Sequence, residues 1–162
     1  MSVNSNNAGS PNKDEPFWKT KSLLEMNIQE WESLCDNCGK CCLQQIEDER
    51  TKQLVFTDVA CDLFDQKTCH CTDYKNRTSR VPNCLRLDAN NVFEAAEFAP
   101  PSCAYRLLTL NQDLPYWHHL RSGDKQTVHR EGLSVKNRTR SMASIDEEKI
   151  EDYVVEWPNN EL

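Results

Sequence analysis

The sequence predicts a small, irregular α+β fold of short helices and one or two β-hairpins, with cysteine-rich loops pinned by metal. Helical and strand periodicities occur only in short stretches, which predicts short elements. Residues 58–90 carry little periodic apolar signal but contain four cysteines. A segment of this length and composition would be poorly ordered alone, and metal ligation is a natural way to order it.

The length of 162 residues is typical of one compact domain. Residues 1–15 are polar, with no apolar period, and we expect a disordered tail there. Order is expected to begin at Pro16, which precedes the first aromatic pair, Phe17 and Trp18. We therefore predict a single cysteine-cluster domain over residues 16–162.

A helix is expected from Ile28 to Leu34. Asn27 and Glu30 match an N-cap and its capping-box partner. Ile28, Trp31 and Leu34 share one face at helical spacing, which predicts that this face is buried. Such a helix would deliver Cys35 at its end.

A hairpin is expected after the first cysteines. Residues 42–46 and 53–57 have strand composition, and the polar residues 47–52 between them suit a turn. This hairpin would begin directly at Cys42.

Two further helices are expected toward the C-terminus. Ser102, after two prolines, can cap a helix that carries Cys103 to Leu108. Residues 113–120 form an aromatic loop. Ser144 and Glu147 match a second capping box, and the helical spacing continues to Trp157, before Pro158.

Composition narrows the partners and the compartment. The net charge of -7 argues against nucleic acid or an anionic membrane surface as a partner, and the basic residues of 136–140 suit a solvated loop. No secretory signal or membrane-spanning stretch is visible, which predicts a cytoplasmic protein with reduced thiols. An odd total of nine cysteines also cannot form a complete set of disulfides.

The most informative motif is the run from Cys35 to Cys42. Cys35, Cys38 and Cys41 are three residues apart, a spacing that can wrap three thiolates around one iron–sulfur cluster, with a fourth ligand from elsewhere. The same start, with Gly39 allowing close backbone approach, also suits a zinc or mononuclear iron knuckle. Since neighbouring side chains usually point apart, Cys41 and Cys42 are not expected to bind the same metal atom.

Downstream cysteines can supply the remaining ligands. Nine thiols could fill two four-ligand sites with one over, or one site with several buried thiols. Cys61 is balanced between ligand and core, and Cys103 favours the core. The predicted metal ligands are Cys35, Cys38, Cys41, Cys42, Cys69, Cys71 and Cys84.

The histidines are weaker candidates. His70 lies between Cys69 and Cys71 and would point the opposite way in an extended segment. His118 and His119 more often belong to hydrogen-bonded structure than to a metal site. The motifs of common enzyme classes are absent, so the sequence leaves open whether the chain is an enzyme.

The chain resembles a known family. Its C-x2-C-x2-C-C run looks like the defining motif of the CxxCxxCC family of zinc- or iron-chelating bacterial proteins, and within it the YcgN-type (UPF0260) branch. The supporting segments lie between about residues 16 and 123: Pro16–Trp18, Glu30–Cys35, Cys69–Tyr74, Pro82–Cys84, Cys103–Leu108 and Leu114–His118. His119 stands where that branch tends to have proline. The resemblance implies a cytosolic metal centre and no particular activity.

The leading hypothesis is therefore a metal-binding protein that holds an iron–sulfur cluster or zinc, in electron transfer or redox sensing. One alternative is a closed structural zinc site that serves binding to an unknown protein partner. Another is an enzyme with an open metal position lined by His118 or Tyr105. A third is a thiol-redox protein without metal, which would need an exposed cysteine of low pKa.

Overall fold

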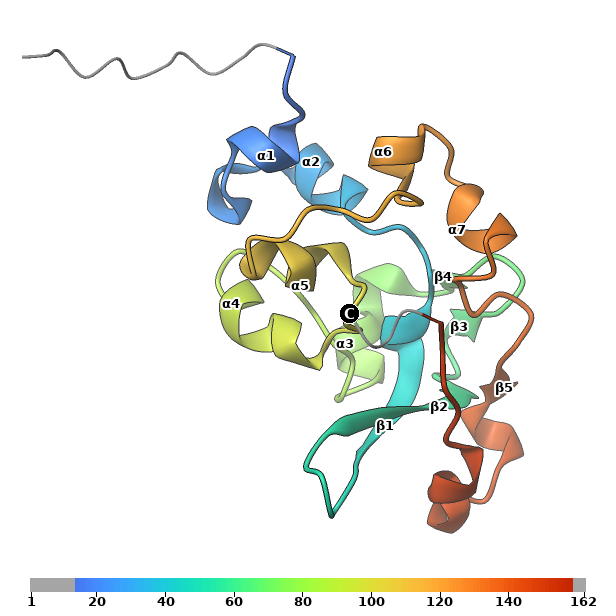
Figure 1. The fold of residues 1–162 in the computed structure, drawn as a ribbon. Helices are drawn as coiled ribbons and strands as arrows, with labels where there is room; N and C mark the ends of the chain where they lie inside the picture. The colour runs from blue at the N-terminus through green and yellow to red at the C-terminus, as the bar shows by residue number, and fades with distance from the viewer. Residues whose placement is uncertain (1–13, 159–162) are drawn as a thin grey trace, which may run out of the picture.

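Short helices and two small sheets make up the fold, which confirms the predicted small α+β class (Figure 1). The computed structural model describes residues 14–158, and residues 1–13 of the predicted tail lie outside this range. Within the described range, no helix has the length and apolar composition needed to cross a membrane.

The elements follow one another with short connections. The α-helices are α1 (Phe17–Thr20), α2 (Ile28–Ser33), α3 (Arg77–Arg80), α4 (Val92–Ala95), α5 (Ala104–Thr109), α6 (His119–Ser122) and α7 (Thr127–Arg130). The strands are β1 (Leu43–Glu47), β2 (Leu54–Ala60), β3 (Phe64–Asp65), β4 (His70–Cys71) and β5 (Arg140–Ser141). The 3₁₀ helices are η1 (Leu23–Glu25), η2 (Lys40–Cys42), η3 (Tyr74–Asn76), η4 (Ala96–Phe98), η5 (Met142–Ser144) and η6 (Glu147–Tyr153).

The predicted helix and hairpin are both present. Helix α2 begins at the predicted capping box, in which Glu30 N–H donates to Asn27 Oδ1 at 2.9 Å. Strands β1 and β2 pair antiparallel, and the short β5 lies parallel to β2 on its other edge. Strands β3 and β4 form a second, two-stranded hairpin inside the region predicted to be irregular.

Three details of the sequence prediction are wrong. Ile28 is 70% exposed, so the buried face of α2 consists of Trp31 and its C-cap Leu34. The N-cap of α5 is Cys103, because the chain turns into the helix one residue after Ser102. The C-terminal segment forms η5 and then η6, with Asp146 as the N-cap of η6, in place of one helix from Ser144. Lys149 has non-helical dihedral angles, which interrupts that helical pattern.

Three small apolar clusters form the core of residues 14–158. The first gathers the helices α2, α4 and α5 and includes Trp31, Leu34 and Tyr105. The second lies on the sheet and includes Leu43, Val135 and Trp157. The third contains Trp117, Val128 and Leu133 near α6 and α7.

The cysteine-bearing segment after α2 runs between these regions. In Figure 1 it is drawn in light blue to cyan, with α4 and α5 on one side and β3 and β5 on the other. Leu34 belongs to the first cluster, Cys38 packs against the third, and Leu43 belongs to the second. The segment 34–43 therefore touches every cluster within ten residues.

Gly39 is the tightest point of this segment. Its φ is +79°, in the left-handed region that favours glycine. A Cβ atom at Gly39 would lie 2.6 Å from Phe64 Cζ and 2.7 Å from Val135 Cγ2. A close approach is thus present, but it is to the side chains of the second cluster, whereas the sequence predicts an approach of the backbone to metal-bound sulfurs.

We predict that Gly39→Ala lowers the free energy of unfolding by about 2–4 kcal/mol, because it adds left-handed strain to overpacking. Gly123→Ala is the matched control, since Gly123 also has a positive φ of +76° but has open space around a Cβ. The control should lose only about 1–2 kcal/mol. Urea unfolding of both variants measures the difference, and equal losses would show that the contacts at Gly39 are unimportant.

Candidate metal centre

The cysteine turn is shaped by two left-handed residues. Asn37 has a φ of +59° and Gly39 a φ of +79°, and both residue types tolerate this conformation. The Asp36 carboxylate accepts a hydrogen bond from the Cys38 amide at 3.0 Å. The Cys42 amide donates to the Gly39 carbonyl at 3.1 Å and closes η2. The turn therefore folds Cys38 and Cys41 back around Gly39.

Backbone bonds from distant segments fasten this turn. The Val135 amide donates to the Cys38 carbonyl at 2.8 Å. The Cys61 amide donates to the Cys42 carbonyl at 2.9 Å. The second bond places the backbone of Cys61, at the end of β2, beside that of Cys42.

One set of cysteines interacts around the turn. Burial raises the pKa of the Cys35 thiol, and Cys41, Asp36 and Cys103 raise it further. Burial raises the pKa of Cys103 to about 12, again with Cys41 contributing. These thiols lie close enough that a charge on one disfavours a charge on the next. Cys35, Cys41 and Cys103 thus share one neighbourhood.

Cys38 belongs to the same neighbourhood. Burial raises the pKa of its thiol well above the usual value, and Asp36 and Cys41 raise it further. The pKa of Cys41 is raised chiefly by its hydrogen bond with Cys42, and then by burial. The Lys40 amide opposes the rise at Cys38, in the manner of the predicted knuckle, where backbone N–H groups favour a thiolate.

A second set lies beside the first. Burial raises the pKa of Cys84, and Cys41, Cys61 and Cys71 raise it further, whereas the nearby Arg77 lowers it. Cys61 is tied to Cys42 by the backbone bond described above. Cys61, Cys71 and Cys84 therefore lie near one another and near Cys41, and the backbone of Cys42 lies beside that of Cys61.

Cys69 stands apart from both sets. It is buried, with a φ of +57°, on the turn between β3 and β4. Burial raises the pKa of its thiol to about 11, and Lys136 and Ser134 oppose the rise. The largest influences on this pKa thus come from burial and from charged or polar residues, and Cys69 as a ligand stays a prediction.

The thiols are gathered but do not form a closed coordination shell. Among residues 14–158, no three side chains of His, Cys, Asp or Glu are arranged as a metal ion would require. Cys35 and Cys41 keep exposed surface as residues, although enough protein surrounds their thiols for burial to raise their pKa. The donor chemistry therefore fits a soft metal, and binding would draw the sulfurs closer together.

Lys40 lies inside the cysteine turn and is the most unusual charged residue of the fold. It is 1% exposed, and within the described residues it forms no ion pair. Its ammonium donates to the Pro158 carbonyl and to Ser102 Oγ. Burial lowers its pKa, and the neighbouring Cys38 and Asp36 raise it. A buried ammonium with only neutral acceptors is costly unless negative charge lies nearby.

The histidine proposed for an open metal position has no free ring nitrogen. His118 is 1% exposed, its Nδ1 accepts from the Leu120 amide at 3.1 Å, and its Nε2 donates to the Leu34 carbonyl at 2.9 Å. Tyr105 is also engaged, because its hydroxyl donates to the Trp31 carbonyl at 2.7 Å. Both side chains hold α2 in place.

The remaining histidines also lie in hydrogen-bonded or stacked positions. His119 stacks on His118 with ring centroids 4.5 Å apart. His70 Nδ1 lies 2.6 Å from the Thr68 carbonyl, and the residue is exposed.

Sequence reasoning missed two residues of the site. Cys103 was assigned to the core, and its thiol does pack against the first cluster while also facing Cys35 and Cys41. The burial of Lys40 is not predicted from the sequence, because lysine side chains are almost always exposed. Its position between two cysteines was the only signal available.

Comparison with known proteins finds a family match over the same cysteine-bearing region. Residues 34–104 match the CxxCxxCC family, described as "Putative zinc- or iron-chelating domain". All nine cysteines lie within this match.

Similar proteins come from several bacteria. A UPF0260 protein of Agrobacterium fabrum is 53% identical over 145 residues, which cover 90% of this chain and 89% of that protein. UPF0260 proteins of Granulibacter bethesdensis and Parvibaculum lavamentivorans are each 50% identical, covering 88% and 90% of this chain and 84% and 94% of those proteins. No solved structure matches the chain significantly.

The raised thiol pKa values predict alkaline instability of the metal-free protein. Cys69 and Cys103 have folded-state pKa values of about 11 and about 12, against a usual value of 9.0. The unfolded chain therefore loses these protons first, so stability is complete below pH 9 and falls as pH rises toward 12. Urea midpoints of chelated protein at pH 8, 10 and 11 measure this.

The Cys103→Ala variant provides the control for the alkaline loss. It should lose less stability between pH 8 and 11 than the original chain, because one titrating thiol is gone. Identical pH dependence in both proteins would mean that Cys103 does not carry this effect.

Proposed function

Because the chain belongs to the UPF0260 family of CxxCxxCC proteins, we propose that it is a metal-binding protein whose centre is held by cysteine thiolates. The observation that carries the proposal is the burial of the Lys40 ammonium inside the cysteine turn, without an ion pair in residues 14–158. Four thiolates around a divalent metal carry a net negative charge. That charge would balance Lys40.

The ligand assignment follows the two neighbourhoods of thiols. We assign the first centre to Cys35, Cys38, Cys41 and Cys103, around the turn and the start of α5. The second is assigned to Cys84, to Cys61 and Cys71, which influence its pKa, and to Cys42, whose carbonyl is bonded to the Cys61 amide. This division uses eight of the nine cysteines and leaves Cys69 as a buried structural thiol.

The division also removes a conflict within the motif. Adjacent side chains such as Cys41 and Cys42 cannot easily reach the same metal atom, and here each belongs to a different centre. Because Cys41 and Cys42 are consecutive residues, the two centres would be neighbours. Neighbouring centres suit the passage of electrons.

We assign an iron–sulfur cluster to the first centre, since three cysteines at x2 spacing with one remote cysteine is the pattern of such clusters. When bound, a cluster supplies one-electron transfer. Lys40 would act as a fixed positive charge beside the cluster, and Gly39 would let the backbone approach the cluster closely. A reducing compartment such as the cytoplasm would keep the thiols free to bind it. Zinc in both centres is the alternative, with a structural role.

The raised pKa values bear on the competing thiol-redox hypothesis. Reactive cysteines have low pKa values because the thiolate is the nucleophile. Those of Cys35, Cys38, Cys41, Cys69, Cys84 and Cys103 are all raised. These thiols would stay protonated until a metal displaces the proton, which favours metal binding over metal-free redox chemistry.

Protein purified without oxygen should contain iron with acid-labile sulfide and show a broad brown absorption band. Cys35→Ser and Cys103→Ser should each remove the first centre, and Cys84→Ser the second, whereas Cys69→Ser should keep the full metal content. Metal and sulfide analysis with visible spectra provides the measurement. If the protein is colourless and contains two zinc ions, the centres hold zinc and no iron–sulfur cluster. If Cys103→Ser keeps its full metal content, Cys103 is not a ligand.

Lys40→Met should weaken metal binding by about 10–100-fold, as expected for a residue that supports the ligands from outside the coordination shell. The fold should survive, because replacing a buried charge by an apolar side chain of similar length is often neutral or stabilising. Titration with Co²⁺ against a competing chelator measures the affinity. Lys125→Met, at an exposed position, is the control, and equal affinities in the two variants would refute the role of Lys40 as countercharge.

A further inference from the structure

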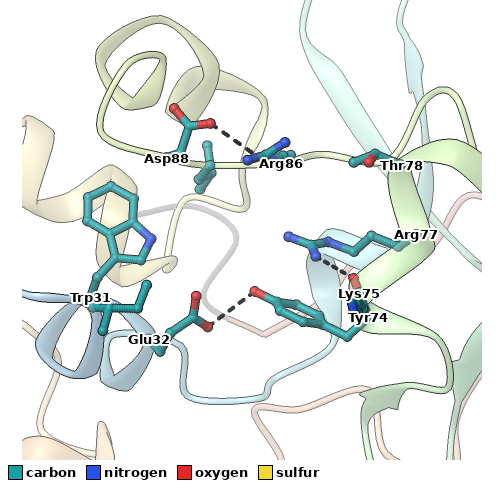
Figure 2. Close-up of a pocket in the computed structure, with 10 residues that line it drawn as sticks. Trp31, Glu32, Tyr74, Lys75, Arg77, Thr78, Arg86 and Asp88 are labelled. Carbon is teal, nitrogen blue, oxygen red and sulfur yellow. Dashed lines mark hydrogen bonds and ion pairs between the residues drawn. The ribbon is translucent and has the colours of Figure 1, made fainter.

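A pocket of about 300 Å³ lies between α2, the η3–α3 segment and the loop before α4 (Figure 2). Trp31 and Glu32 of α2 form one wall. Tyr74 and Arg77 face them from the opposite wall, and the loop with Arg86 closes a third side. This volume is at the small end of the range for small-molecule sites.

The charges around the pocket are unusual for an acidic chain. Lys75, Arg77 and Arg86 line it together with only two carboxylates, Glu32 and Asp88. The Asp88 carboxylate is paired with Arg86 Nε at 3.5 Å. The pocket therefore keeps an excess of positive charge although the net charge of the chain is -7.

The Glu32 carboxylate does not neutralise Arg77 directly. It accepts a hydrogen bond from the Tyr74 hydroxyl at 3.2 Å. Within residues 14–158, Arg77 forms no ion pair. One of the two basic side chains that reach into the pocket in Figure 2 is thus without a carboxylate partner.

Arg77 is held ready for a ligand by its neighbours. Its guanidinium lies 3.7 Å from the centroid of the Tyr74 ring, and Nη1 donates to the Tyr74 carbonyl. The guanidinium has five N–H donors in a fixed fork, so one bond to the backbone leaves others available. In Figure 2 the side chain extends across the pocket toward the Trp31 side.

We propose that this pocket binds a small organic anion, in which a carboxylate or phosphate group sits on Arg77 and a flat apolar portion lies against Trp31. The planar fork of arginine matches the oxygens of both anions, and stacking on Tyr74 restricts its orientation. Trp31 is 8% exposed and packed on Tyr105 with ring centroids 5.0 Å apart, so it offers a rigid but narrow aromatic edge. Ile28, which is 70% exposed, lines the same pocket and supplies further apolar surface.

No cysteine lines the pocket. Its walls are nevertheless close to cysteines in sequence, since Glu32 precedes Cys35 by three residues, Tyr74 follows Cys71 by three, and Arg86 follows Cys84 by two. Arg77 is near enough to lower the pKa of Cys84. Recognition of the anion uses none of the thiols and does not depend on which metal they hold.

The test is a titration followed by ¹⁵N NMR of the tryptophan indole groups in the full chain, with Trp31→Phe used to assign the Trp31 signal. The probes are benzoate, phenyl phosphate, inorganic phosphate and the neutral benzamide. Benzoate or phenyl phosphate should shift the Trp31 signal saturably, and benzamide should bind at least about tenfold more weakly, because it lacks the charge that pairs with Arg77. The better of the two anions identifies the carboxylate or the phosphate as the preferred group.

Arg77→Met should weaken anion binding by about tenfold or more, and Arg77→Lys by less, since lysine keeps the charge but loses the fork. Arg80→Met is the matched control, because Arg80 lies on the same helix, is paired with Asp73 at 2.9 Å and does not line the pocket. Should Arg77→Met not fold, the comparison of Arg77→Lys with Arg80→Met decides.

Three results would overturn the proposal. The first is that no probe shifts the Trp31 signal saturably. The second is that inorganic phosphate binds as tightly as both organic anions, which would show that Trp31 is not part of the site. The third is that the Arg77 and Arg80 variants bind equally.

Discussion

The close approach of the backbone at Gly39 is the constraint on which the rest of the structure depends. A side chain there would meet Phe64 and Val135, so this position brings the cysteine turn into direct contact with the cluster on the sheet. Five residues before it, Leu34 is fully buried among the helices, and one residue before it, Cys38 packs against the third cluster. The three clusters are joined through this stretch of backbone, and the distances between their elements are set by one turn.

This arrangement explains why metal binding and folding are expected to be linked. Each apolar cluster is small, and a small cluster contributes little stability by itself. The segment that joins them also carries thiols and the buried Lys40 ammonium. Ligation would fix the turn, balance the buried charge and hold the clusters together in one step.

Local signals in the sequence were sufficient for elements whose structure is decided locally. The capping box of Asn27 and Glu30 and the polar turn of the hairpin act within a few residues, and both are found as predicted. The exposure of Ile28, the burial of Lys40 and the meeting of Cys103 with Cys35 depend on segments far apart in the chain. Likewise, the helical spacing before Trp157 was overridden, since Trp157 packs on the sheet and donates to the Thr57 carbonyl. Which cysteines bind a metal depends on such long-range contacts, and the spacing of cysteines along the sequence does not reveal them.

Lys40 and Arg77, neither of which forms an ion pair within residues 14–158, both lie near cysteines. Lys40 lies inside the turn, whereas Arg77 lies in the pocket and lowers the pKa of Cys84 from outside. A nearby positive charge favours the thiolate, so each cation would stabilise the deprotonated ligands of one proposed centre. In a chain whose net charge is -7, positive charge is thus placed beside thiols that would have to lose their protons to bind a metal.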